Sequence, residues 1–199
     1  MNSYHLALFL HVLGALVLFV AVGLNFLSML RMRQAGDMNR FREWAMLGRQ
    51  AGRIIPIAIL CIACSALYMV STVWGWQTAW VDVALGTFLA HGVLVLAIEN
   101  PRLSALQKAA KRFASGPTPA PLLRQARHPL LWLCECVVTG TTVGMIYLMT
   151  LKPDLPGSLM AIGVSLALSG TAALPFCRAE RTQISEPASA RRALSDKAA

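Results

Sequence analysis

The sequence has little charge and no long polar stretch that could form a soluble domain. Charged residues make up 14% of its 199 residues, whereas soluble domains average about 25%. Hydrophobic residues make up 56%, and the mean hydropathy is +0.57. The sequence also lacks a glycine-rich phosphate loop, a nucleophile elbow and a paired metal-ligand motif. These absences argue against a soluble enzyme and predict that most of the chain lies in lipid.

Cysteine is also sparse, and its placement excludes a secreted disulfide framework. The chain has five cysteines, an odd number, and four of them (Cys61, Cys64, Cys134 and Cys136) fall inside apolar runs. We interpret the Cys61-x-x-Cys64 spacing, which lies on an expected helix, as small packing residues, with metal binding as the alternative. No basic segment precedes the first apolar run, so this run is expected to remain as an anchor.

What the sequence does contain is a series of apolar runs long enough to cross a bilayer core of about 30 Å. These runs cover residues 5–29, 54–75, 79–98, 129–151 and 156–176. They predict an all-α transmembrane bundle that forms a single domain over residues 1–177. The remaining residues, 178–199, turn to Ser, Ala, Arg and Glu without an apolar period, which predicts a disordered cytoplasmic tail.

Basic residues set the expected orientation. They concentrate in residues 30–53, in residues 99–128 and in the tail, while the turn near residues 75–78 has none. The positive-inside rule therefore predicts an N-terminus outside and a C-terminus inside. The net charge of +9 is explained by this asymmetry, so we expect the lipid bilayer as a partner and no nucleic acid.

Tryptophans support the same orientation, because their rings favour the membrane interfaces. Trp74, Trp76 and Trp80 fall near the expected outer surface, and Trp44 and Trp132 near the inner one.

Two segments between the spans lead to separate predictions. Residues 37–48 fit either an amphipathic surface helix or a connector that continues into the second span. Residues 115–121 are rich in proline and predict a loop.

Small residues on the fourth run predict a packing seam. Gly140 and Gly144 are four residues apart, a spacing that lets two helix backbones approach closely in lipid. This seam leaves a homo-oligomer or another membrane-protein partner as a further expectation.

Polar residues inside spans are costly and so are candidates for function. Helical rise places His11 and Asp82 in an outer layer, and His91 and Glu135 in an inner layer. For His11 we expect a neutral imidazole bonded to a backbone carbonyl or to Asp82, with haem or metal ligation as the alternative. For His91 and Glu135 we expect a buried hydrogen-bonded pair, with a proton relay as the alternative.

Four motifs together resemble a bacterial family of integral membrane proteins of unknown function (DUF 2269). They are Leu-His-Val-Leu-Gly-Ala at 10–15, Gly-Arg-Gln-Ala-Gly-Arg at 48–53, Pro-Arg-Leu at 101–103, and Leu-Met-Thr-Leu-Lys-Pro-Asp at 148–154 followed by Gly-Ser at 157–158. The resemblance covers residues 5–175 and implies a small multi-helix protein of the bacterial inner membrane. It supplies no reaction.

The His-x-x-Gly-Ala pattern that begins at His11 is also similar to the first helix of haem- and copper-associated membrane proteins of the protoporphyrinogen oxidase and copper resistance D type. This similarity implies that His11 could hold haem b, and His91 is the candidate second ligand.

Three functions follow as expectations. The first is a non-enzymatic membrane component that acts by binding or association. The second is a small b-haem or metal-dependent redox protein that uses His11 and His91. The third is a proton-coupled carrier of a small solute that uses His91 and Glu135, although the sequence has no inverted repeats.

Overall fold

A computed structural model describes residues 3–185, which form an all-helical protein with 88% helix and no strand within that range. The expected all-α class is therefore confirmed. The elements are α1 (Ser3–Gln34), α2 (Met38–Met69), the π-helical turn η1 (Val70–Trp74), α3 (Ala79–Leu94), the π-helical turn η2 (Val95–Glu99), α4 (Asn100–Ala110), α5 (Ala120–Ala126), α6 (Pro129–Leu151) and α7 (Leu155–Ser185).

Five helical segments of the described chain are long and apolar enough to cross a membrane. Each covers all or nearly all of one expected run, and most extend well beyond it. The first, Ser3–Gln34, has 32 residues, or about 48 Å of helix. This length exceeds a lipid core of about 30 Å by about three turns, so the helix is longer than one crossing requires.

The start of α2 decides between the two predictions for residues 37–48, whereas most of the predicted tail lies outside the described residues. Residues 38–48 continue directly into the second span as the start of α2, and the Asp37 side chain caps this helix by accepting hydrogen bonds from the backbone N–H groups of Asn39 and Arg40, each at 3.0 Å. Helix α7 extends to Ser185, beyond the expected end of the last span. The rest of the tail expected to be disordered, residues 186–199, lies outside the described residues.

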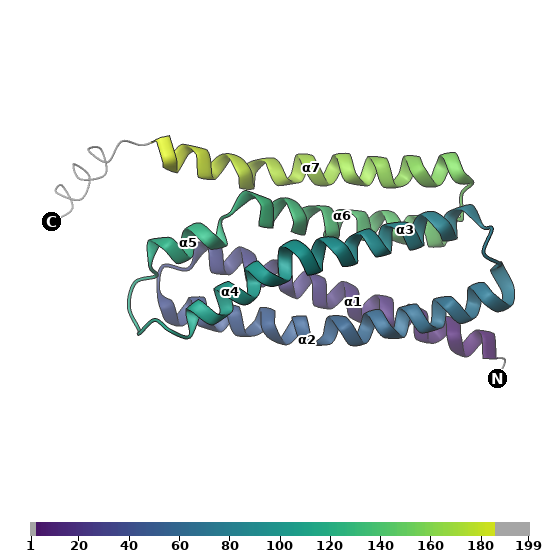
Figure 1. The fold of residues 1–199 in the computed structure, drawn as a ribbon, viewed down its shortest axis with the longest axis horizontal. Helices are drawn as coiled ribbons and strands as arrows, with labels where there is room; N and C mark the ends of the chain where they lie inside the picture. Colours follow the sequence, from purple (N-terminus) through teal and green to yellow (C-terminus); the bar gives the residue numbers. More distant parts are fainter. Residues whose placement is uncertain (1–2, 186–199) are drawn as a thin grey trace.

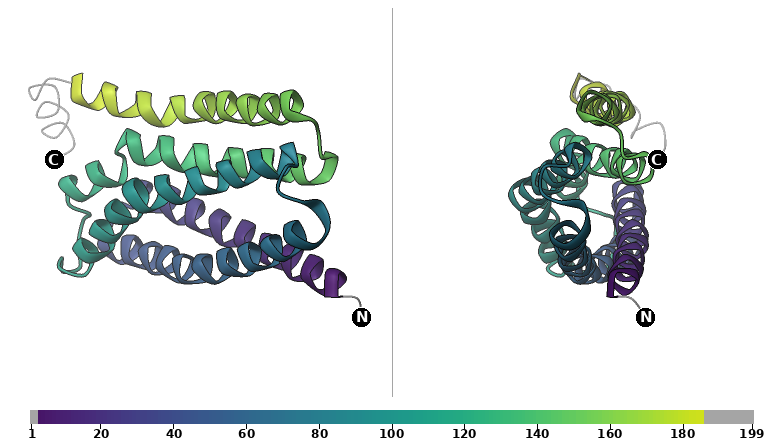
Figure 2. Two further views of the ribbon diagram at one scale, coloured as in Figure 1. Left: turned by 45° about the vertical axis from the view of Figure 1, so that its right-hand side comes forward. Right: turned by 90° about the vertical axis from the view of Figure 1, so that its right-hand side faces the viewer.

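The helices run side by side as an elongated bundle (Figure 1). Helix α1 packs along α2, and α6 packs along α7 and also contacts α3. Helix α7 lies at the edge of the bundle, as both views of Figure 2 show. The described chain begins and ends at opposite ends of the bundle (Figure 1), as an odd number of spans requires.

The large hydrophobic core lies at one end of the bundle, where the α1–α2 and α4–α5 connections meet. We call this the arginine-rich end, after the arginines that cluster there in the sequence. The core consists of Met29, Met32, Ala35, Met38, Phe41, Ala45, Leu103, Leu106, Ala110, Leu122, Ala126, Leu131 and Trp132. Elsewhere, large apolar side chains such as Phe9 and Leu89 are about 60% exposed, as expected for surfaces that face lipid.

The opposite end of the bundle carries an aromatic cluster. The rings of Trp74 and Trp80 meet edge to face with centroids 5.5 Å apart. The ammonium of Lys152 lies 3.9 Å from the Trp74 ring centroid and 6.0 Å from that of Trp80, and a cation over an indole face is attracted electrostatically. This contact fixes the connection between α6 and α7 to the start of α3.

Candidate functional site

Three polar side chains from three spans meet in the interior, and we call them the carboxyl centre: Asn25 of α1, Glu99 of η2 and Glu135 of α6. The side chain of Asn25 donates one hydrogen bond of 2.9 Å to Glu99 Oε1 and another of 3.4 Å to Glu135 Oε2. This shared amide nitrogen holds the two carboxyl groups next to each other. All three residues are buried, with 5% exposure or less.

The π-helical turn η2 determines where Glu99 points. In a regular α-helix, Glu99 would lie about 80° around the axis from His91, because eight residues turn 800°. A π-helical turn accommodates one extra residue, which reduces this offset to about 20° in the other direction. His91 and Glu99 therefore lie on nearly the same side of this span, toward α6. Such turns occur often at functional sites.

Two ionised carboxylates that share one amide donor repel each other, so this arrangement favours a form in which the pair holds a proton. The centre also has unused acceptors. Asn25 Oδ1 and Glu135 Oε1 are buried and have no hydrogen-bond partner among residues 3–185. Buried acceptors without a donor are rare in proteins and point to a proton, a water or a cation.

The surroundings do not supply that positive charge. Among residues 3–185, no arginine or lysine forms an ion pair with either carboxyl group. The guanidinium of Arg102, which follows Glu99 in the sequence, donates to the backbone oxygen of Ile98 at 3.2 Å. The Cys134 thiol donates to the Leu94 oxygen at 3.8 Å. The carboxyl centre is therefore acidic, enclosed and not neutralised by a neighbouring side chain.

His91 occupies a second polar position between α3 and α6. Its Nε2 contacts the Thr141 hydroxyl, and that hydroxyl donates its proton to the Val137 backbone oxygen at 2.5 Å. Thr141 therefore accepts from His91, so in the neutral ring Nε2 carries the proton and Nδ1 is free to accept one. Thr141 lies six residues from Glu135, or about 9 Å along α6.

His11 forms a third polar position, toward the end of the bundle that carries Trp74 and Trp80. Its Nδ1 lies 3.3 Å from both the Ile62 backbone oxygen and the Ser65 hydroxyl, while that hydroxyl donates to the backbone oxygen of Cys61 at 2.7 Å. Nε2 lies 3.4 Å from the Met149 sulfur. Helix α6 thus provides a partner at each of the three positions, namely Glu135, Thr141 and Met149.

The structure separates some residues that depth alone placed together. Glu135 is at the carboxyl centre, but its side-chain partners are Asn25 and Glu99, while His91 bonds to Thr141. His11 has the backbone-carbonyl partner that was one of its two expected arrangements. Asp82, the other expected partner, is exposed.

Sequence reasoning missed Asn25 and Glu99 as site residues. Glu99 was placed one residue beyond the end of the expected third span, among basic residues, and so was not treated as buried. Asn25 lies inside the first expected span but is not among the polar candidates. Their depth could have identified them as neighbours of Glu135, because Asn25, Glu99 and Glu135 all lie within about 9 Å of the same expected membrane boundary.

The arrangement does not fit a haem held between His11 and His91. The Met149 sulfur lies against His11 Nε2 and His91 Nε2 faces Thr141, so neither imidazole directs this nitrogen toward the other. Among the described residues, no group of three or more His, Cys, Asp or Glu side chains is placed to hold a metal ion. The chemistry that the arrangement supports best is the reversible binding of a proton or small cation by oxygen ligands.

Comparisons of the chain with protein-family models, with curated proteins and with solved structures found no match.

Proposed function

We propose that this protein is a non-enzymatic component of the bacterial inner membrane that reversibly binds a proton at the carboxyl centre, in the manner of a proton-coupled carrier of a small solute. The observation that carries the proposal is the placement of the buried Glu99 and Glu135 carboxyl groups on one shared donor, the Asn25 amide. Carboxyl groups inside a membrane are a common element of proton pathways in pumps and transporters. Glu99 takes the place that sequence reasoning gave to His91.

The geometry gives each residue a role. One glutamate holds the exchangeable proton between the two carboxyl groups, and the Asn25 amide stabilises the negative charge that remains when this proton leaves. Asn25 Oδ1 and Glu135 Oε1 have no hydrogen-bond partner among the described residues. These two oxygens can therefore accept a second proton or a hydrogen bond from a water. His91 of α3, whose Nε2 contacts Thr141 of α6, is the next group that can accept a proton, at its Nδ1.

Infrared difference spectroscopy tests this proposal on the purified, lipid-reconstituted protein. Spectra taken in sodium-free buffer between about pH 5 and about pH 9 span the range in which a perturbed carboxyl group exchanges its proton. We expect a protonated-carboxyl band that decreases as pH rises, because the shared proton is released. The band should be lost in the double variant Glu99→Gln, Glu135→Gln.

The matched control is Asp82→Asn, which removes an exposed carboxyl group from the same span and should leave the band unchanged. A pH-dependent band that survives in the double variant would contradict the assignment. A spectrum that responds to sodium at constant pH, and not to pH itself, would assign the centre to Na⁺ instead and overturn the proton proposal.

The proposed orientation places the arginine-rich end in the cytoplasm. It is supported by the basic segments 30–53 and 99–128, which both connect helices at that end of the bundle. A reporter active only in the periplasm should give signal when inserted after Trp76 and none when fused after Ala199, because retained loops are rich in Lys and Arg. The reverse pattern, or equal signals at both positions, would refute this topology.

A further inference from the structure

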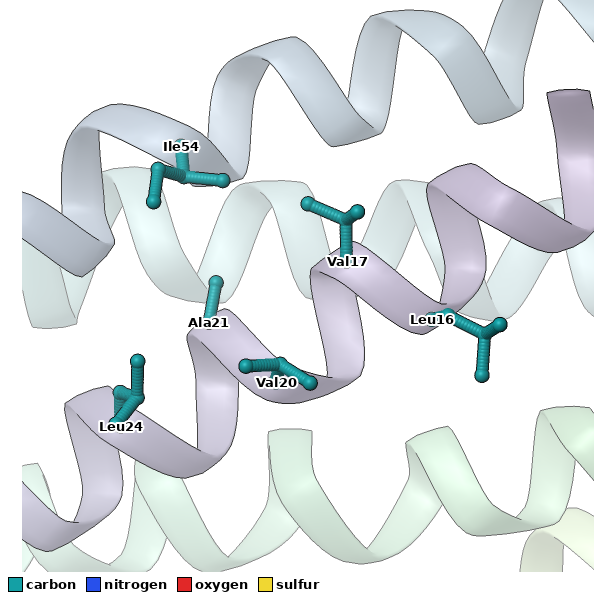
Figure 3. Close-up of a pocket in the computed structure, with 6 residues that line it drawn as sticks. All are labelled: Leu16, Val17, Val20, Ala21, Leu24 and Ile54. Atoms are coloured by element: carbon teal, nitrogen blue, oxygen red, sulfur yellow. The ribbon is translucent and has the colours of Figure 1, made fainter.

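An apolar groove runs along the junction of α1 and α2 within the membrane-spanning part. It has a volume of about 230 Å³ and almost no polar lining. Its lining residues are Leu16, Val17, Val20, Ala21, Leu24 and Ile54. Figure 3 shows Val17 and Ala21 pointing from α1 toward the helix that carries Ile54. The groove is open on one side.

The same face of α1 leads from the groove to an arginine at the arginine-rich end. Leu24 and Arg31 are seven residues apart, so they differ by only about 20° around the helix axis. Arg31 is exposed, and its guanidinium carbon lies 5.7 Å from the centroid of the Trp44 ring. Arg31 has no ion-pair partner among residues 3–185. An unpaired cation beside an interfacial tryptophan is suited to an anionic headgroup.

The distance along α1 from Leu16 to Arg31 matches the thickness of one lipid leaflet. From Leu16 to Leu24 the groove covers about 12 Å of helix, and from Leu24 to Arg31 there is about 10 Å more. Half of the hydrocarbon core is about 15 Å, and one headgroup region adds about 6 Å. A phospholipid whose chain lies in the groove would therefore bring its phosphate to the level of Arg31.

We infer that the α1–α2 groove binds one anionic phospholipid from the leaflet at the arginine-rich end, with an acyl chain against Val17 and Ala21 and the phosphate at Arg31. The single arginine at this position favours a singly charged headgroup. Phosphatidylglycerol has this charge. The lipid would stabilise the crossing of the first two helices, and this role is independent of the carboxyl centre.

Native mass spectrometry of the full-length protein tests this inference with two probes that share the same acyl chains, phosphatidylglycerol and phosphatidylcholine. We expect one phosphatidylglycerol to be retained about fivefold more strongly, which is the effect of one arginine near an anionic surface. Arg31→Gln should reduce this preference to near equality. Val17→Phe, which fills the groove, should weaken the binding of both lipids.

Matched controls separate this site from general charge and lipid effects. Arg40→Gln removes an exposed arginine that pairs with Asp37 at 3.6 Å, and Val93→Phe enlarges an exposed apolar residue of α3; neither should change retention. Equal retention of both lipids by the unaltered protein, or a loss of preference in Arg40→Gln as large as in Arg31→Gln, would refute the site. Displacement of the lipid by inorganic phosphate would show a phosphate site without a chain groove and would also overturn the inference.

Discussion

Replacing Trp132 by alanine is expected to lower the free energy of unfolding by about 3–5 kcal/mol, the usual loss for a fully buried aromatic side chain. Trp132 has 0% exposure, stacks on Phe176 with centroids 4.4 Å apart, and lies under the guanidinium of Arg33 at 5.2 Å. Its indole N–H donates to the Ala126 oxygen at 2.9 Å. The substitution would remove all of these contacts and leave a cavity where α6 meets α1 and α7.

Unfolding of the purified protein in mixed micelles, followed by circular dichroism as denaturing detergent is added, measures this loss. Trp76→Ala is the control, since Trp76 is 53% exposed and its removal should change stability by less than about 0.5 kcal/mol. Trp132→Phe keeps an aromatic ring at this position but not the N–H donor, so we expect an intermediate loss of about 1–2 kcal/mol. Equal stabilities for Trp132→Ala and Trp76→Ala would show that the core at the arginine-rich end is not packed as described.

The second large effect is expected from Asn25→Leu, which keeps the branching at Cγ but removes the amide. Two hydrogen bonds to carboxyl groups disappear, and each such bond contributes about 1.5–3 kcal/mol when the acceptor is charged. We expect a loss of about 2–4 kcal/mol at alkaline pH. The loss should be smaller in acid, because two protonated carboxyl groups can bond to each other without the amide.

A second substitution makes this result specific to the carboxyl centre. In Asn25→Leu, Glu135→Gln the new glutamine amide can donate to Glu99, so the double variant should recover part of the stability lost by Asn25→Leu alone, and its stability should depend less on pH. Unfolding in mixed micelles at two pH values measures both effects. If the two single changes simply add, the residues do not act as one unit.

The number of spans could be predicted from the sequence because bilayer thickness sets a minimum length for each apolar run. The ends of the helices could not. The expected ends fell at the first charged residues, whereas α1 and α2 continue past Arg31 and Arg53, because Met32 and Phe41 on their far turns pack into the core. Charged residues on the outer faces of these turns do not interrupt the helices.

The carboxyl centre was only half predictable for a similar reason. Glu135 stood out because it interrupts an apolar run, and an ionisable residue inside a span is functional by default. Glu99 did not stand out, because its burial depends on η2, and a π-helical turn has no sequence pattern comparable to a helix cap. Depth along straight helices suggested His91 as the partner of Glu135, but rotation about the helix axes placed Thr141 against His91 and Glu99 against Glu135.

The core at the arginine-rich end also constrains the order in which the protein is made. It joins Met29 to Trp132, which are about 100 residues apart, so its long-range contacts close late in synthesis. Helices α1 and α2 are synthesised first. The apolar side chains on their turns at the arginine-rich end, including Met32 and Phe41, therefore stay exposed until α6 has been synthesised. A nascent chain that stops before α6 would therefore leave these apolar side chains exposed, and this exposure would make it a substrate for proteolysis.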